Sequence, residues 1–198
     1  MTEWEKLQSG LIYNDFDEDL FRQRVIAKKL FRKYNKTEDD EIELRSKIMQ
    51  DLFEHVGKNV WIEPDFRCEY GKNISIENDV YINFGCIILD CAKITVGEHT
   101  LLGPNVGIYA ANHLTDAEER INGGCYGKPV HIEKRVWIGG DVKIVGGVSV
   151  GNDTIIGAGS VVTKDIPDGV IAVGNPCRVI KKMTKADKTD YLKNFNTT

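Results

Sequence analysis

The chain has 198 residues, of which 41% are hydrophobic and 28% charged, and its formal net charge is -4. This length suits one medium-sized domain, and the acidic balance excludes an overall positive field of the kind that holds nucleic acid. No apolar run approaches the roughly 18 residues that a membrane span needs, so we expect neither nucleic acid nor a membrane as a partner.

The cysteine pattern predicts a reducing compartment. The five cysteines are an odd number, and no two of them are spaced as C-x-x-C. This argues against both a disulfide framework and a zinc cage. Because the first thirty residues are dense in charge and show no export signal, we expect a cytoplasmic protein.

Two amphipathic helices are expected near the N-terminus. Apolar residues recur at helical spacing over 20–34 and again over 42–53. Thr37 followed by Asp40 resembles a capping box that would start the second helix. We therefore expect residues 1–57 to form a helical cap.

A six-residue period dominates the second half of the chain. A fixed period of six fits neither a helix nor a single strand and is typical of a stacked solenoid. We call each six-residue repeat a word. Three words would close one triangular coil, in which the first residue of each word points inward and glycine is favoured at the second position. The first positions are all β-branched: Ile132, Ile138, Ile144, Val150, Ile156 and Val162.

The same period runs upstream with two irregularities. It resumes two residues late at Val96, which predicts a widened corner near 92–95, and it is lost between Ile108 and Ile132. We expect a solenoid over 58–183 with an external loop at 109–131, and a loop of this length is usually functional or disordered. Residues 184–198 are expected to form a tail, and the lysine-rich stretch 181–188 a frayed helix or part of that tail.

Several motifs resemble those of the maltose and galactoside O-acetyltransferases. They are GKPV at 127–130, VWIGG at 136–140, IGAGSVVTKDIP at 156–167 and GNPCRV at 174–179, with Ala111-Asn112-His113 in the interrupted region. The resemblance implies an all-β, left-handed parallel β-helix of hexapeptide repeats that assembles as a homotrimer with active sites between subunits. It also implies acetyl-CoA as donor, a sugar hydroxyl as acceptor and no metal.

The resemblance assigns His113 as the catalytic base and Asn83 as a second catalytic residue. Acyl transfer from a thioester to a hydroxyl needs a base and donors for the developing oxyanion. Asn83 would bind the acceptor hydroxyl or steady the tetrahedral intermediate, although an asparagine ladder at a solenoid corner is the structural alternative. The remaining histidines, His55, His99 and His131, are expected on the surface, and the four show no close pair with the spacing of zinc ligands.

Three positions match the acceptor side of the family, and two aromatic residues could add to it. Asp15, Arg24 and Glu69 would receive or position sugar hydroxyls, since carboxylates accept hydroxyl hydrogen bonds. Tyr81 and Trp137 would give the sugar an apolar wall, although core packing or a trimer contact is an equal interpretation.

Three residues depart from the galactoside-type pattern. Glu69 stands where that type has a smaller hydroxyl residue, Cys91 where it has an acidic ligand, and Cys125 where a larger apolar residue is usual. The identity of the acceptor therefore stays open.

Donor binding is assigned to the later coils. The backbone N–H of Gly140 is a candidate hydrogen-bond donor to the oxyanion. The side chains of Lys164, Arg178 and Lys181 would bind the nucleotide phosphates, and the alternative is that they form a solvated C-terminal face. The residues implied for acetyl-CoA are Gly140, Ala158, Thr163, Lys164, Arg178 and Lys181.

Direct transfer without an acyl-enzyme is expected, because no cysteine is placed as a nucleophile by the sequence. Two other functions remain open from the sequence. One is an acetyltransferase for an amino acid, antibiotic or amino sugar, and the other is a non-catalytic solenoid that serves as a binding module.

Overall fold

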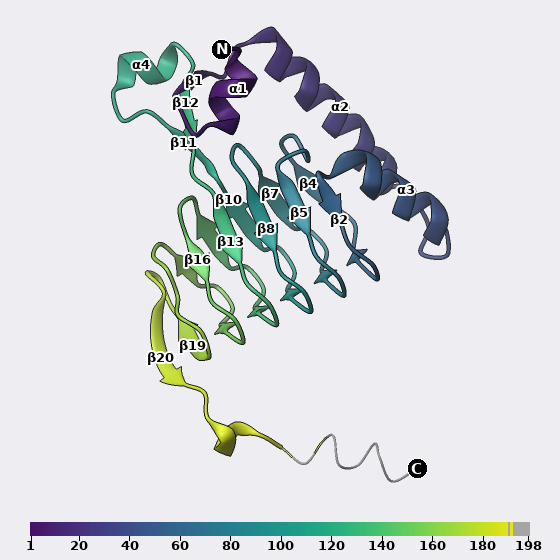
Figure 1. Cartoon of the computed structure of the whole chain (residues 1–198), viewed down its shortest axis with the longest axis vertical. Coiled ribbons are helices and arrows are strands. Elements are labelled where there is room, and N and C mark those ends of the chain that lie inside the picture. The colour runs from purple at the N-terminus through teal and green to yellow at the C-terminus, as the bar shows by residue number, and fades with distance from the viewer. Residues whose placement is uncertain (190, 192–198) are drawn as a thin grey trace.

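The computed structural model describes residues 1–189 and 191. Short parallel strands stack into a three-faced β-helix, with helices gathered at its N-terminal end (Figure 1). The all-β parallel solenoid predicted from the six-residue period is confirmed.

Each face of the β-helix is one parallel sheet built from strands of successive coils. The first face consists of β4 (Arg67–Cys68), β7 (Ile87–Leu89), β10 (Gly107–Tyr109), β15 (Lys143–Val145) and β18 (Val161–Val162). The second face consists of β2 (His55–Val56), β5 (Ile74–Ile76), β8 (Ile94–Val96), β13 (Val130–Ile132) and β16 (Ser149–Val150). The third face begins with β3 (Trp61–Ile62), β6 (Tyr81–Ile82), β9 (Leu101–Leu102), β14 (Trp137–Ile138) and β17 (Ile155–Ile156).

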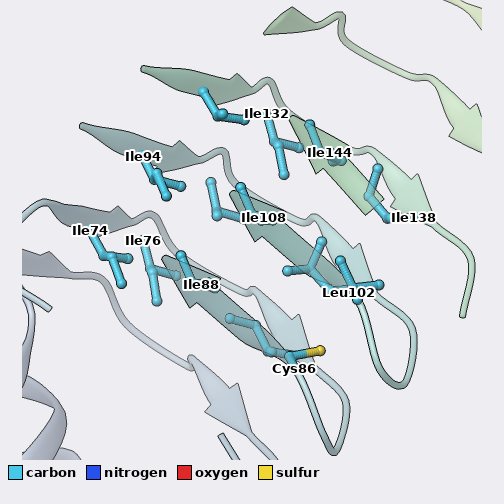
Figure 2. Close-up of a cluster of buried hydrophobic side chains, with 14 of the residues drawn as sticks. Ile74, Ile76, Cys86, Ile88, Ile94, Leu102, Ile108, Ile132, Ile138 and Ile144 are labelled. Atoms are coloured by element: carbon cyan, nitrogen blue, oxygen red, sulfur yellow. The ribbon is translucent and has the colours of Figure 1, made fainter. Parts of the chain in front are cut away.

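Aliphatic side chains fill the interior of the β-helix in columns. On the first face Ile88, Ile108, Ile144 and Val162 lie in register across adjacent strands. The first residue of every six-residue word exposes at most 1% of its surface. Figure 2 shows these side chains converging from successive coils. Burying one such side chain stabilises the fold by about 1.5–3 kcal/mol, so the columns supply most of the cohesion.

Glycine at the second position of a word allows the coils to approach at a corner. A Cβ atom built on Gly139 would lie 2.6 Å from the backbone nitrogen of Ala158 in the next coil. Any larger residue would therefore separate the coils there.

The N-terminal cap contains three helices: α1 (Glu3–Gln8), α2 (Glu18–Tyr34) and α3 (Ile42–Leu52). The two helices predicted from apolar spacing are confirmed as α2 and α3, whereas α1 was not predicted. The predicted capping box is wrong, because α3 begins after Glu41 without a side-chain cap and the Thr37 hydroxyl donates to the carbonyl of Tyr34.

A buried arginine fastens this cap to the first coil. The Arg45 side chain from α3 is 2% exposed and donates to the carbonyl oxygen of Ile62 at 2.7 Å. Its guanidinium lies 5.0 Å from the ring centroid of Tyr34 and 4.3 Å from that of Trp61. Cation–π contacts and a charge-assisted hydrogen bond thus join helix and solenoid.

The insertion after β10 folds into a hairpin. β11 (Ala111–His113) and β12 (Gly124–Gly127) pair in antiparallel fashion around the short helix α4 (Ala117–Ile121). β1 (Tyr13–Asn14), from the cap, adds to β12 and completes a three-stranded sheet. The region predicted as an external loop is therefore tied to the N-terminal segment.

The C-terminal end differs from the prediction. β19 (Val170–Val173) and β20 (Arg178–Lys182) form an antiparallel pair that completes the third face, so Lys181 lies in a strand rather than in a frayed helix or tail. A 3-10 turn follows at Lys185–Asp187, and residues 190 and 192–198 of the predicted tail lie outside the described residues. None of the described helices is long and apolar enough to cross a membrane.

Two early corners are wider than the later ones, and a buried carboxylate shapes both. β4 ends at Cys68 and β5 begins at Ile74, while β7 ends at Leu89 and β8 begins at Ile94. Asp90, in the second of these corners, is fully buried and accepts hydrogen bonds from backbone N–H groups of the first. The donors are Glu69 at 2.9 Å, Tyr70 at 2.8 Å and Asn73 at 3.2 Å.

We predict that Asp90→Ala lowers the free energy of unfolding by about 2–4 kcal/mol, because three amide donors lose their acceptor. Denaturant unfolding followed by circular dichroism measures this change. Asp51→Ala, at an exposed position of α3, serves as the control and should cost less than about 0.5 kcal/mol. Equal effects of the two substitutions would show that the Asp90 contacts contribute nothing specific.

Candidate active site

The insertion hairpin brings a histidine and a cysteine into contact. His113 on β11 and Cys125 on β12 are register partners, and Tyr13 on β1 is in turn opposite Cys125. The sulfur of Cys125 lies 3.0 Å from Nδ1 of His113. The cysteine is buried and the histidine is exposed, so the imidazole stands at the surface with one nitrogen already engaged.

A pocket of about 140 Å³ opens beside His113. It collects residues from the cap, the two widened corners and the hairpin, which are distant in sequence. Asp15 and Glu69 supply its carboxylates, whereas Leu89, Cys91 and Ala111 supply apolar surface. The lining is completed by Tyr13, Asn112, His113 and Cys125.

An arginine holds the two carboxylates of the pocket. Nη1 of Arg24 lies 2.5 Å from Oδ1 of Asp15, and Nη2 donates to the Asp15 carbonyl oxygen at 2.8 Å. Nε of the same arginine lies 3.7 Å from Oε1 of Glu69. Asp15, Arg24 and Glu69, which the sequence analysis assigned to the acceptor side, are thus brought together around His113.

Burial raises the pKa values of one carboxyl group and two thiols in this pocket. It raises the pKa of the Glu69 carboxyl, against the opposing charges of Arg24 and Lys28. It also raises the pKa of Cys125 to about 11 and that of Cys91 to about 12. Both thiols are therefore protonated at neutral pH, so neither offers a thiolate in the pocket.

Asn83 does not line this pocket. It follows β6 at the corner between the third and first faces, where its Oδ1 accepts from the N–H of Phe84 at 2.8 Å. His113 follows β10 at the corner between the first and second faces. The predicted pair of catalytic residues therefore lies on two different edges of the β-helix.

Tyr81 and Trp137 lie in one row on the outside of the third face. Leu101 stands between them in register, and the Tyr81 hydroxyl donates to Oε1 of Glu63 at 3.1 Å. Trp137 is 53% exposed. Of the roles left open by the sequence, core packing is excluded for Trp137, and neither residue lines the His113 pocket.

The residues predicted to bind the donor are divided between the same two edges. Gly140 and Ala158 follow β14 and β17 on the Asn83 edge, whereas Thr163 and Lys164 follow β18 on the His113 edge. Among the described residues the Gly140 N–H meets no hydrogen-bond acceptor. Arg178 is exposed on β20, and Lys181 forms an ion pair with Asp187 that already offsets its charge.

The other histidines lie outside the pocket. His55 belongs to β2, and both it and His99 are exposed as expected. His131 is partly buried on the second face, with Nδ1 3.0 Å from the Thr95 hydroxyl. Within residues 1–189 and 191, the one potential metal-ligand cluster is Asp79, Glu98 and His99, of which only His99 is exposed and none lines the pocket.

The sequence missed two features of the site. Tyr13 enters the pocket because β1 pairs with the hairpin, and Cys125 contacts His113 because the hairpin register places them opposite each other. Neither pairing follows from the six-residue period, which is absent here. Cys125 was noticed only as a departure from a pattern.

Comparisons with known proteins decide the family. The maltose acetyltransferase hexapeptide capping motif matches residues 6–57, and the bacterial transferase hexapeptide (six repeats) matches residues 129–164. The galactoside O-acetyltransferase of Escherichia coli K12 is 39% identical over 191 residues, which are 96% of this chain and 94% of that protein. The chain belongs to the maltose and galactoside O-acetyltransferase family.

Two solved structures of this family have the same fold as the chain. A maltose O-acetyltransferase from Clostridium difficile 630 is 50% identical with a TM-score of 0.91, covering 93% of this chain and 99% of that one. A galactoside acetyltransferase in complex with coenzyme A is 39% identical with a TM-score of 0.90, covering 96% of each chain. The family is thus that of acetyltransferase enzymes, as the resemblance implied.

The buried thiols give a direct test of the pocket. All five cysteines are free and buried, and burial raises the pKa of each. We predict that the native protein reacts with iodoacetamide at neutral pH at least about tenfold more slowly than free cysteine, because little thiolate is present. Mass spectrometry should count five modified cysteines after denaturation. Rapid labelling of native Cys125 would mean that its thiol is ionised beside His113.

Proposed function

We propose that the protein transfers an acetyl group from acetyl-CoA to a hydroxyl of a sugar, with His113 as the general base. The observation that carries this proposal is the pocket beside His113, in which carboxylates fit for sugar hydroxyls surround the imidazole. Membership of a sugar acetyltransferase family supports the donor and the acceptor class.

In this proposal Nε2 of His113 is the nitrogen that acts, and the contact of Cys125 with Nδ1 supports it. With Nδ1 held by the sulfur, Nε2 is the nitrogen free to accept a proton. For this role the ring hydrogen sits on Nδ1 and is donated to the sulfur, which is a weak acceptor. A protonated thiol, rather than a thiolate, faces the ring because burial keeps the pKa of Cys125 high.

The reaction proceeds in one ternary complex. His113 removes the acceptor proton while the hydroxyl oxygen attacks the thioester carbonyl carbon, and hydrogen-bond donors hold the resulting oxyanion. The uncommitted N–H of Gly140 is our candidate donor. The tetrahedral intermediate then expels the CoA sulfur, which takes the proton back from His113, so that free CoA and the acetyl ester leave.

A complete site needs two chains. One edge of the β-helix bears His113 and the acceptor carboxylates, and another edge bears Asn83 and Gly140. We therefore propose a homotrimer in which the first edge of one subunit faces the second edge of its neighbour, with acetyl-CoA between them. The exposed row that includes Trp137 supports a contact on the third face, because an isolated chain would leave it in water.

Substitution of the base tests the reaction. We expect His113→Ala to lower kcat for acetyl transfer by about 10² or more, the usual scale for a lost general base. CoA release is measured with acetyl-CoA and a panel of glucose, maltose, galactosides, serine and glucosamine. A loss below about tenfold in a protein with an unchanged circular dichroism spectrum would contradict the assigned role.

Mixing two inactive variants tests the shared site. We expect His113→Ala and Asn83→Ala to be impaired separately and to regain activity when co-expressed, because mixed trimers form some sites with both residues intact. Random assortment would restore roughly one quarter of the wild-type sites. A site contained in one chain would gain nothing from mixing, and that result would exclude the shared cleft.

A further inference from the structure

A second groove continues from the His113 pocket and has no part in the reaction described above. It has a volume of about 590 Å³ and lies between α2 and the strands β4 and β7 of the first face. Glu69 and Leu89 line both the groove and the pocket. The groove and the pocket therefore adjoin at these two residues.

The groove is basic, although the chain as a whole is acidic. Four cationic and two anionic side chains line it, whereas the net charge of the chain is -4. One carboxylate, Glu69, belongs to the pocket end, and the other, Asp65, is exposed. The cations are Lys28, Arg32, Lys36 and Arg67.

These four cations have no partners of their own. Across residues 1–189 and 191, none of their side chains forms an ion pair within 4.0 Å or a hydrogen bond. The other arginine on this side of the cap, Arg24, is by contrast held by Asp15. The Glu69 carboxyl acts on Lys28 at longer range, but among the described residues no carboxylate forms an ion pair with any of the four cations.

Helix stability does not account for this arrangement. The negative end of the α2 dipole favours cations in the last turn, where Arg32 and Lys33 lie. Lys28 lies before that turn, and Arg67 projects from the opposite wall of the groove. Lys28 and Arg32 are four residues apart on one helix face, a spacing at which like charges repel. The helix dipole therefore does not account for Lys28 or Arg67, and the cluster as a whole fits a role in binding.

The phosphates of the donor have a different candidate site. The first face runs in the order β18-β15-β10-β7-β4, and His113 follows from the middle strand, β10. The groove lies at β4 and β7, whereas Lys164 and Arg178 lie beyond the other end, after β18 and on β20. The candidate phosphate site and the groove thus lie on opposite sides of His113 along the β-helix.

We propose that the groove binds an anionic group of the acceptor, so that the preferred substrate is an acidic saccharide bearing a carboxylate or phosphate away from the acetylated hydroxyl. This inference rests on the proposed function. The small pocket holds the reacting sugar by its hydroxyls, and the cations hold the charged remainder by charge-assisted hydrogen bonds.

Matched acceptors and variants test the charge preference. We measure kcat/KM for glucose and glucose 6-phosphate, and for galactose and galacturonate, with digalacturonate as a longer acid. At least one anionic acceptor should exceed its neutral counterpart by about fivefold or more. In the double variant Lys28→Gln/Arg32→Gln this ratio should fall by about fivefold, and added salt should lower it in the wild type.

Lys29→Gln/Lys33→Gln is the control, because these lysines have the same spacing on α2 and do not line the groove. It should leave the ratio unchanged. The inference would be overturned if kcat/KM for each neutral acceptor equalled or exceeded that for its acidic counterpart, or if both double variants changed the ratio equally. Either result would leave the proposed function standing. A rise in KM for acetyl-CoA in Lys28→Gln/Arg32→Gln would assign the groove to the donor. No transfer to any sugar would overturn the proposed function itself.

Discussion

The packing of β-branched side chains inside a narrow three-faced coil is the constraint on which the rest of the molecule depends. Because Ile88, Ile108 and Ile144 fill the interior in register, no space remains there for a ligand. Chemistry is therefore confined to corners, to the outer faces and to segments that interrupt the repeat. The widened corners and the insertion after β10 are such places, and they meet at His113.

The fold could be predicted from the sequence because the position of a residue within its six-residue word predicts whether its side chain is buried. The words from Ile132 to Val162 fixed the inward residues, and the structure confirms every one. The predictions failed where stability comes from tertiary contacts. The C-terminal strand β20 exists because β19 pairs with it, although its residues are polar and exposed. Likewise α3 begins without the expected cap, since Arg45 and the first coil hold it in place.

The site was predicted in part, through resemblance rather than periodicity. Asp15, Arg24, Glu69 and His113 do converge, because the corner held by Asp90 carries Glu69 toward α2. The sulfur beside the imidazole was not foreseen, since it depends on hairpin register in a region without repeats. Asn83 lies elsewhere because corners alternate around the coil, and consecutive corners of one chain face away from each other.

This separation of edges links the fold to assembly and to substrate choice. A solenoid of one chain offers convex edges, and a concave site arises only where a second surface faces one of them. At the His113 edge, α2 provides such a surface and forms the basic groove together with β4 and β7. Among the described residues, the Gly140 N–H at the Asn83 edge has no hydrogen-bond acceptor, and Trp137 is exposed on the third face. The cap thus shapes the His113 edge, whereas in the proposed homotrimer a neighbouring subunit would cover the Asn83 edge.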